Sequence, residues 1–383
     1  MLAAVCASFV ARAQAVSPTP VPDAPVPGAT TSGFLGNCST LPDRKMTACY
    51  VRGLLAAVDR SGNPAYGVPR IDARVHATGG FLEAACHSFM HTVGRTWARQ
   101  HGVTLGTLMD YIPRSNDPGC SAGFGMGMAM YLGPKILVDP PAALATCSRL
   151  ATRFREYTCV HGLGHALMRG YHGQLRDAVR ACRTLGPLNA PDCSQGAFHD
   201  YWISLSGADG TTRPEDADTS ARSLCAGYEF ARPCWFRFYW ERMPDEHVYE
   251  ASDILRLCKG LEGLQRAGCV SGASLSLSRS REPVDHARTC GQLEGSDTID
   301  CLRGVSVPSV ANKPFERMRL IRTCADLPRT TRSRCFNWFG RTLTVVTDGR
   351  FRQIGCARLA DPRARVWCTA GAERTNRPLR TFS

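Results

Sequence analysis

Five histidines are concentrated in one part of the chain, at spacings that suit metal binding. They are His87, His91, His161, His165 and His199. The first four form two pairs whose members are four positions apart, so on a helix both imidazoles of a pair lie on one face, about 6 Å apart. Two imidazoles at that spacing can bind one metal ion. The sequence therefore predicts metal binding in this part of the chain.

The pair His161 and His165 is predicted to share its site with His199. If the two segments form neighbouring helices about 10 Å apart, the three imidazoles can converge on one ion. Three protein ligands leave one coordination position open, as catalytic metal sites require, whereas structural sites are usually closed by four ligands. Gly162 and Gly164, which lie between the paired histidines, are expected to leave room for a substrate or a water molecule beside the ion.

Three further residues are candidates for catalysis. Asp200 and Tyr201 directly follow the last histidine, where either could orient a metal ligand or donate a proton. Upstream, Glu83, His87 and His91 are spaced at i, i+4 and i+8, which on a helix gives a stripe of one carboxylate and two imidazoles. This stripe is expected to be either a second metal site or the substrate side of the first.

The identity of the metal stays open among copper, zinc and iron. Thioethers together with imidazoles suit copper, and the segment 123–130 carries three methionines, whereas glutamate with imidazole suits zinc or iron. The same segment has glycine or alanine at alternate positions, which instead favours close helix contact with the methionines in the core. Cys86 and Cys120 either bridge each other or serve as thiolate ligands beside the histidines.

The reaction is not specified by any motif in the sequence. The patterns of zinc proteases, covalent haem attachment, serine hydrolases and nucleotide-binding loops are all absent from it. The first functional hypothesis is therefore a metal-dependent enzyme, either an oxidoreductase or a hydrolase, that acts on an unidentified small-molecule or polymer substrate.

The elements that must position these histidines are marked by cysteines. The chain has 19 cysteines, and setting aside Cys6 near the N-terminus leaves an even number. Eight pairs have members 9 to 12 residues apart: Cys38 with Cys49, Cys147 with Cys159, Cys182 with Cys193, Cys225 with Cys234, Cys258 with Cys269, Cys290 with Cys301, Cys324 with Cys335, and Cys356 with Cys368. From the second pair onward, the second members recur at intervals of 34, 41, 35, 32, 34 and 33 residues, the period of a helical-hairpin repeat.

Each repeat is predicted to be two helices joined by a disulfide-bonded turn. The first helix is expected to end near the first cysteine, and the second helix to begin at the second cysteine. Six repeats have a glycine three residues after the second cysteine, where it would let a neighbouring helix pack closely: Gly123, Gly162, Gly196, Gly272, Gly304 and Gly371. A single hairpin cannot bury its apolar face alone, so stacking supplies stability and each local disulfide adds about 2–3 kcal/mol.

The predicted fold is all-α, a superhelical array of about ten disulfide-stapled α/α hairpin repeats. It is similar in kind to solenoids of the Sel1/TPR type, although the sequence has no consensus match to those repeats. A content of 44% hydrophobic and 21% charged residues over 383 positions excludes wholesale disorder. No apolar run approaches the 20 or so residues of a membrane span, so no transmembrane segment is expected.

The N-terminus predicts a secreted or periplasmic protein. Residues 1–15 are expected to be a signal peptide, because Met1–Val10 is apolar and Ala13-Gln14-Ala15 fits a signal-peptidase site. A Pro/Ser-rich linker is expected over 16–35, followed by helical repeats that carry the histidines over 36–205. Export permits disulfides, and it argues against a nucleic-acid partner.

The C-terminal repeats, 206–383, are predicted to be basic. Of the formal net charge of +13, the last 105 residues contribute 19 arginines and one lysine against ten acidic residues. Arginines here could form a surface for an anionic partner: Arg303, Arg317, Arg319, Arg322 and Arg341. The alternative is an ordinary charged exterior. The second functional hypothesis follows from the surface: a non-catalytic solenoid that binds an anionic partner or a protein, with its histidines merely packed or pH-responsive.

Overall fold

The regular elements of the described residues are all helical. The computed structural model describes Leu35 and residues 38–150, 152–205, 221–242, 250–280, 283–304, 314–346 and 355–374. The predicted signal peptide, with its cysteine, and nearly all of the predicted linker lie outside these residues. The all-α prediction is confirmed.

The helices of the first half carry the histidines. They are α1 (Asp43–Arg60), α2 (Pro64–Thr78), α3 (Gly80–Gln100), α4 (Leu108–Tyr111), α5 (Cys120–Tyr131), α6 (Gly133–Val138), α7 (Pro140–Cys147), α8 (Arg153–Gly170), α9 (Leu175–Arg183) and α10 (Gly186–Leu205), preceded by the 3-10 turn η2 (Cys38–Thr40). Local chemistry sets their starts: Thr152 caps α8 by accepting a hydrogen bond from the Arg155 amide at 3.3 Å, and Asp139 caps α7 through the Ala142 amide at 3.0 Å.

The second half of the chain is also helical in its described residues. They are α12 (Ala231–Arg242), α13 (Ala251–Leu257), α14 (Gly263–Ser280), α15 (Pro283–Gly291), α16 (Asp297–Leu302), α18 (Pro314–Asp326), α19 (Arg329–Val346) and α21 (Pro362–Arg374). No helix among the described residues combines the length and apolarity that crossing a membrane requires.

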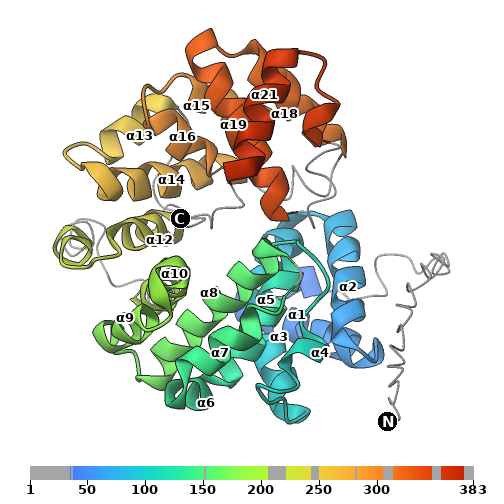
Figure 1. The fold of residues 1–383 in the computed structure, drawn as a ribbon. Coiled ribbons are helices and arrows are strands. Elements are labelled where there is room, and N and C mark those ends of the chain that lie inside the picture. Colours follow the sequence, from blue (N-terminus) through green and yellow to red (C-terminus); the bar gives the residue numbers. More distant parts are fainter. Residues whose placement is uncertain are drawn as a thin grey trace, which may run out of the picture.

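The second helix of each hairpin packs on its counterparts in the neighbouring repeats. Consecutive contacts run α3–α5–α8–α10–α12–α14–α16–α19–α21, so these helices form one continuous stack. Figure 1 shows the stack curving, with the first half of the chain on one side and the second half returning over it. Helix α19 also contacts α8, so the array bends back on the histidine-bearing half. The repeated helical array that the cysteine spacing predicts is present.

The disulfides form in the predicted pattern. All eight local pairs are bonded, with Cα–Cα distances of 5.4–5.7 Å. Cys86 and Cys120 form a ninth bond across 34 residues, which joins α3 to α5. Of the two alternatives for these cysteines, the disulfide is correct and thiolate ligation is excluded.

The predicted start of the second helix is wrong for the hairpins closed by the eight local disulfides, whereas α5 begins at Cys120 as predicted. Helix α8 begins at Arg153, six residues before Cys159, and α10 begins at Gly186, seven residues before Cys193. The second cysteine must come within about 5.5 Å of the end of the first helix. In α8 and α10, the second turn of the helix is the part that contacts the end of the first helix of the hairpin. The second cysteine therefore lies inside the helix rather than at its start.

The glycines that follow the second cysteines allow helix backbones to touch. A Cβ atom on Gly196 would lie 1.9 Å from the carbonyl oxygen of His161, and one on Gly164 would lie 1.9 Å from the carbonyl oxygen of Cys193. The same is true in later repeats, where a Cβ on Gly371 would lie 2.0 Å from the Asn337 oxygen. Only glycine permits this approach, so the repeats stack at unusually short range.

The expectation that glycines leave room beside the metal site is therefore wrong. A Cβ on Gly162 would lie 2.9 Å from the Ala129 side chain, so α5 fills the space next to it. The space next to Gly164 is filled by the backbone of α10. These two glycines hold α8 tightly between its neighbours, and they position the histidines rather than a substrate.

Candidate metal centre

The five imidazoles converge on one region between three helices. His87 and His91 lie on α3, His161 and His165 on α8, and His199 on α10. Ring centroids are 4.7 Å apart for His87 and His91, 5.1 Å for His91 and His165, 5.0 Å for His161 and His165, and 4.7 Å for His165 and His199. The two groups of histidines seen in the sequence are one cluster in space.

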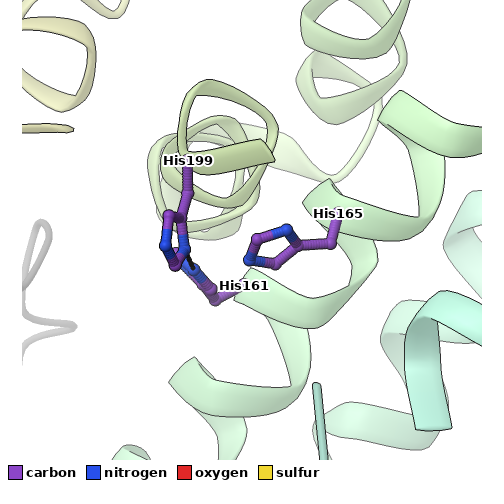
Figure 2. Close-up of side chains that lie close together, drawn as sticks. All are labelled: His161, His165 and His199. Carbon is purple, nitrogen blue, oxygen red and sulfur yellow. Dashed lines mark hydrogen bonds between the residues drawn. The ribbon is translucent and has the colours of Figure 1, made fainter. Parts of the chain in front are cut away.

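Three of these histidines could hold a metal ion. Ligand nitrogens of His161, His165 and His199 all lie within 4.8 Å of one another. Figure 2 shows the His165 ring pointing toward the pair formed by the other two. His161 Nε2 and His199 Nδ1 are 3.2 Å apart. For an ion about 2.05 Å from both nitrogen atoms, the N–metal–N angle would be about 100°, close to the tetrahedral value.

The orientation of His165 is fixed by Asp200. His165 Nδ1 donates to Asp200 Oδ1 at 3.3 Å, and Arg169 Nη2 donates to the same oxygen at 3.2 Å. Although burial opposes it, these hydrogen bonds hold the pKa of Asp200 below its usual value, so it remains a carboxylate. His165 Nε2 is then the nitrogen with the lone pair, and it is fully buried with no hydrogen-bond partner in the described structure. A carboxylate that orients a histidine in this way is typical of metal ligands.

His87 is oriented in the same manner by a main-chain carbonyl. Its Nδ1 donates to the Pro118 oxygen at 2.6 Å, which leaves the lone pair on Nε2. That atom accepts a hydrogen bond from His91 Nε2 at 3.1 Å. Two imidazoles on different helices are therefore set with Nε2 directed into the cluster.

All five imidazoles are neutral at physiological pH. Burial lowers the pKa of His87 to about 4, and it lowers the pKa values of His91, His161 and His199 well below the ordinary value. Burial also lowers the pKa of His165, although the hydrogen bond to its carboxylate partner opposes the shift. Neutral imidazole is the form that binds metals, so the cluster needs no deprotonation before binding.

Helix packing places the cluster through glycines on the neighbouring elements. A Cβ on Gly123 would lie 2.2 Å from the His87 oxygen, and one on Gly127 would lie 2.3 Å from the His91 oxygen. Helix α5 therefore lies directly against the backbone that carries the upstream histidines. Glycine contacts of the same kind join α8 to α10. The three histidine-bearing helices are therefore held by helices packed at backbone contact distances.

A buried arginine that the sequence reasoning missed lies beside the cluster. Arg237 on α12 is 2% exposed, and its Nη2 donates to His161 Nε2 at 3.3 Å; an ion bound at that nitrogen would replace this hydrogen bond. Its guanidinium carbon lies 4.0 Å from the centre of the Trp240 ring, and that ring stacks on His199 with centroids 6.3 Å apart. The sequence does contain an indication that this residue is unusual, because Arg237 lies three residues after Cys234, where six other repeats have glycine.

Glu83 does not join the histidines that follow it on α3. Its Oε1 accepts a hydrogen bond from His76 Nδ1 at 2.8 Å, and Asp117 Oδ2 accepts one from His76 Nε2 at 2.9 Å. The bond to Asp117 and the one to Glu83 raise the pKa of His76 to about 9. Asp72, His76 and Asp117 could together hold an ion, but the imidazole is protonated, and Asp72 already accepts from the amides of the first turn of α5.

Three further candidates are Tyr201, a second histidine–cysteine group and the methionines of α5. Tyr201 packs on Trp202, with ring centroids 5.1 Å apart. A third geometric group, His286 with Cys290 and Cys301, offers no thiolates because the two cysteines are bonded to each other. The methionines of α5 are buried, with exposures of 0–5%, as core packing requires.

The arginines expected on a basic surface have different environments. Arg322 is exposed, whereas Arg303 is paired with Asp300. Arg341 lies half-buried on α19, close enough to the buried Arg232 for its charge to lower the pKa of that guanidinium. The side chains of Arg317 and Arg319 lie outside the described residues.

The chain matches no family model, and neither the curated proteins nor the solved structures contain a match to it.

Proposed function

We propose that the histidine cluster binds a transition-metal ion and that the protein is a metal-dependent enzyme. The observation that carries this proposal is the pair of preset nitrogens: His165 Nε2 and His87 Nε2 are each turned toward the cluster by a hydrogen bond on the opposite ring nitrogen. Such bonds fix the tautomer and orientation of metal-ligating imidazoles. Imidazoles packed only for stability would not need these two rings to be oriented with Nε2 directed into the cluster.

The proposed ligands of the first ion are His161, His165 and His199. His87 and His91 face them across the cluster, where they are proposed to hold a second ion or to contact the substrate. An all-imidazole set suits zinc, copper or iron, and a bound ion would supply either Lewis-acid activation or electron transfer. The first favours hydrolysis and the second favours oxidation, so the identity of the metal decides the reaction class.

The chain's own residues support the proposed chemistry in separate ways. Asp200 orients His165 and keeps its lone pair on Nε2. Burial of four of the five imidazoles excludes bulk water from most of the centre, with exposures of 0–9%. His87 alone in the cluster keeps partial exposure, so the proposed entry for a substrate is on its side.

Secretion or periplasmic location is part of the proposal. Nine disulfides in the described residues are typical of an oxidising compartment, since thiols stay reduced in most cytosols. The apolar N-terminal segment with its small-residue cleavage pattern supports export.

Metal analysis of the untagged protein tests the proposal. We expect a stoichiometric transition metal in protein produced in an oxidising compartment, and its loss in the variant with His161→Ala and His165→Ala. His101→Ala is the matched control, because this exposed imidazole stacks on Trp97 away from the cluster. Wild-type protein that binds no transition metal after incubation with zinc, copper and iron salts would contradict the proposal.

A further inference from the structure

The fixed positive charge of Arg237 lies at the edge of the histidine cluster, and it bears on what the metal centre accepts. We infer that the open position of this centre takes a carboxylate-bearing ligand, which Arg237 holds while one carboxylate oxygen binds the ion. The inference rests on the proposed metal site and adds the chemical class of its substrate.

Arg237 is held in a defined position by burial and by contacts with its neighbours. Its guanidinium is almost completely buried, and Nη2 lies 3.3 Å from a nitrogen of the proposed ligand His161. The guanidinium carbon lies 4.0 Å from the centre of the Trp240 ring. The guanidinium thus contacts this ring and the imidazole of His161, and it also hydrogen-bonds to the side chain of Tyr157.

The charge balance of the centre calls for an anion. Arg237 places a full positive charge 3.3 Å from His161 Nε2, at the edge of the cluster. A divalent ion would add two further positive charges in a region of low dielectric, where like charges repel strongly. Asp200 compensates in part, but it also accepts from Arg169. A negatively charged ligand beside both the ion and Arg237 removes this repulsion.

The shape of the guanidinium selects among anions. Its planar fork matches a carboxylate, with two parallel N–H···O bonds, better than it matches a spherical ion such as chloride. A carboxylate also offers an oxygen to a metal ion. The two interactions can be made by one group only if the arginine and the ion are neighbours, as the 3.3 Å contact to His161 implies.

The repeat pattern supports the same inference independently. At three residues after the second cysteine, six repeats have glycine for close helix contact, but this repeat has Arg237. At six residues after the second cysteine, the two preceding repeats have the cluster histidines His165 and His199, and this repeat has Trp240. The third repeat of the series thus presents a cation and an aromatic ring at the positions that face the metal centre.

Anion titration of the cobalt-loaded protein tests the inference. Cobalt(II) is added to metal-free protein, and its visible absorption is followed while sodium acetate is added at constant ionic strength. We expect acetate to change the spectrum of the wild type, and Arg237→Met to weaken acetate binding about tenfold or more. The variant should still bind one equivalent of cobalt at saturation, its affinity for the neutral ligand imidazole should change far less than its affinity for acetate, and Arg237→Lys should bind acetate with intermediate affinity.

Arg232→Met is the matched control, because Arg232 is also buried on the same helix, at 8% exposure, but pairs with Asp300 at 3.3 Å. It should bind acetate as the wild type does, and circular dichroism establishes that each variant is folded. If Arg237→Met bound acetate within twofold of the wild-type affinity, the inference would be overturned. The proposed metal site would still stand in that case, provided that the variant binds cobalt. Chloride binding as tight as acetate binding would overturn the carboxylate class. Failure of the wild type to bind cobalt would instead refute the metal site.

Discussion

Two glycines on α5 offer a controlled test of how the cluster is positioned. A Cβ on Gly123 would lie 2.2 Å from the His87 carbonyl oxygen, whereas a Cβ on Gly125 would meet nothing closer than Pro113 Cδ at 3.9 Å. Both residues are buried in the same helix, two positions apart. Gly123→Ala therefore forces α3 and α5 apart by about 1 Å, since an ordinary carbon–oxygen contact is about 3.4 Å.

The expected energies follow from these contacts. Overpacking costs about 1–3 kcal/mol, and replacing a helical glycine by alanine gains up to about 1 kcal/mol. Gly125→Ala should thus raise the stability slightly, and Gly123→Ala should lower it, with a difference of about 1–3 kcal/mol between the two. Thermal unfolding of metal-free protein with intact disulfides measures the difference.

Metal affinity provides the second measurement on the same two variants. The displacement in Gly123→Ala moves the backbone of His87, and metal sites tolerate changes of only about 0.2 Å in ligand distance. Because His87 is proposed to hold a second ion or to contact the substrate, we expect Gly123→Ala to weaken binding of that ion or substrate, and Gly125→Ala to bind as the wild type does. Equal stability and equal metal affinity in the two variants would refute the conclusion that glycine contacts position the cluster.

Three further predictions concern the cluster and its supports. Asp200→Asn should weaken metal binding about 10- to 100-fold with little change in fold, because the amide cannot fix His165 as the carboxylate does; metal titration measures this. Burial lowers the pKa of His87 from about 6.5 to about 4, so the unfolded chain binds protons first, and metal-free protein should lose stability as pH falls through that window. Thermal unfolding between pH 7 and 4 checks this, and His87→Gln should flatten the dependence. Alkylation of unreduced mature protein should detect no free thiol, because Cys86 and Cys120 are bridged.

Each of these predictions has a contrary result. Unchanged affinity in Asp200→Asn would mean that the carboxylate does not orient a ligand. Stability that rises as pH falls from 7 to 4 would mean that the imidazoles are charged in the folded protein. Two or more free thiols in the mature chain would contradict the disulfide pattern.

The repeat could be predicted from the sequence because the spacing of the cysteines follows the period of the repeat. A disulfide requires its partners within a few ångströms, so regular spacing such as that of Cys182 and Cys193 implies a regular structure. The role of the following glycines was also visible, since a residue without a side chain at a fixed offset has few other uses. The helix starts were missed because the sequence shows where two segments meet, but not which turn of the second helix makes the contact.

The site was visible only in part. Histidine spacing placed His161 and His165 on one face, but spacing within one helix carries no information about α3, 70 residues away. The sequence therefore left open whether the upstream histidines form a separate metal site or lie beside the first one. Glu83 lies on the same helical stripe as His87, but its carboxylate accepts a hydrogen bond from His76 on α2. This is a tertiary contact, which the spacing within one helix does not reveal. Arg237 was overlooked because it breaks the repeat pattern without resembling a ligand.

X-ray absorption spectroscopy of the metal-loaded protein tests the central claim most directly. The account predicts a shell of nitrogen neighbours about 2.0–2.1 Å from the ion, with the multiple-scattering signature of at least three imidazoles, and loss of that signature in the variant with His161→Ala and His165→Ala. A coordination shell of sulfur or of carboxylate oxygen without imidazole, or a spectrum unchanged in that variant, would contradict it.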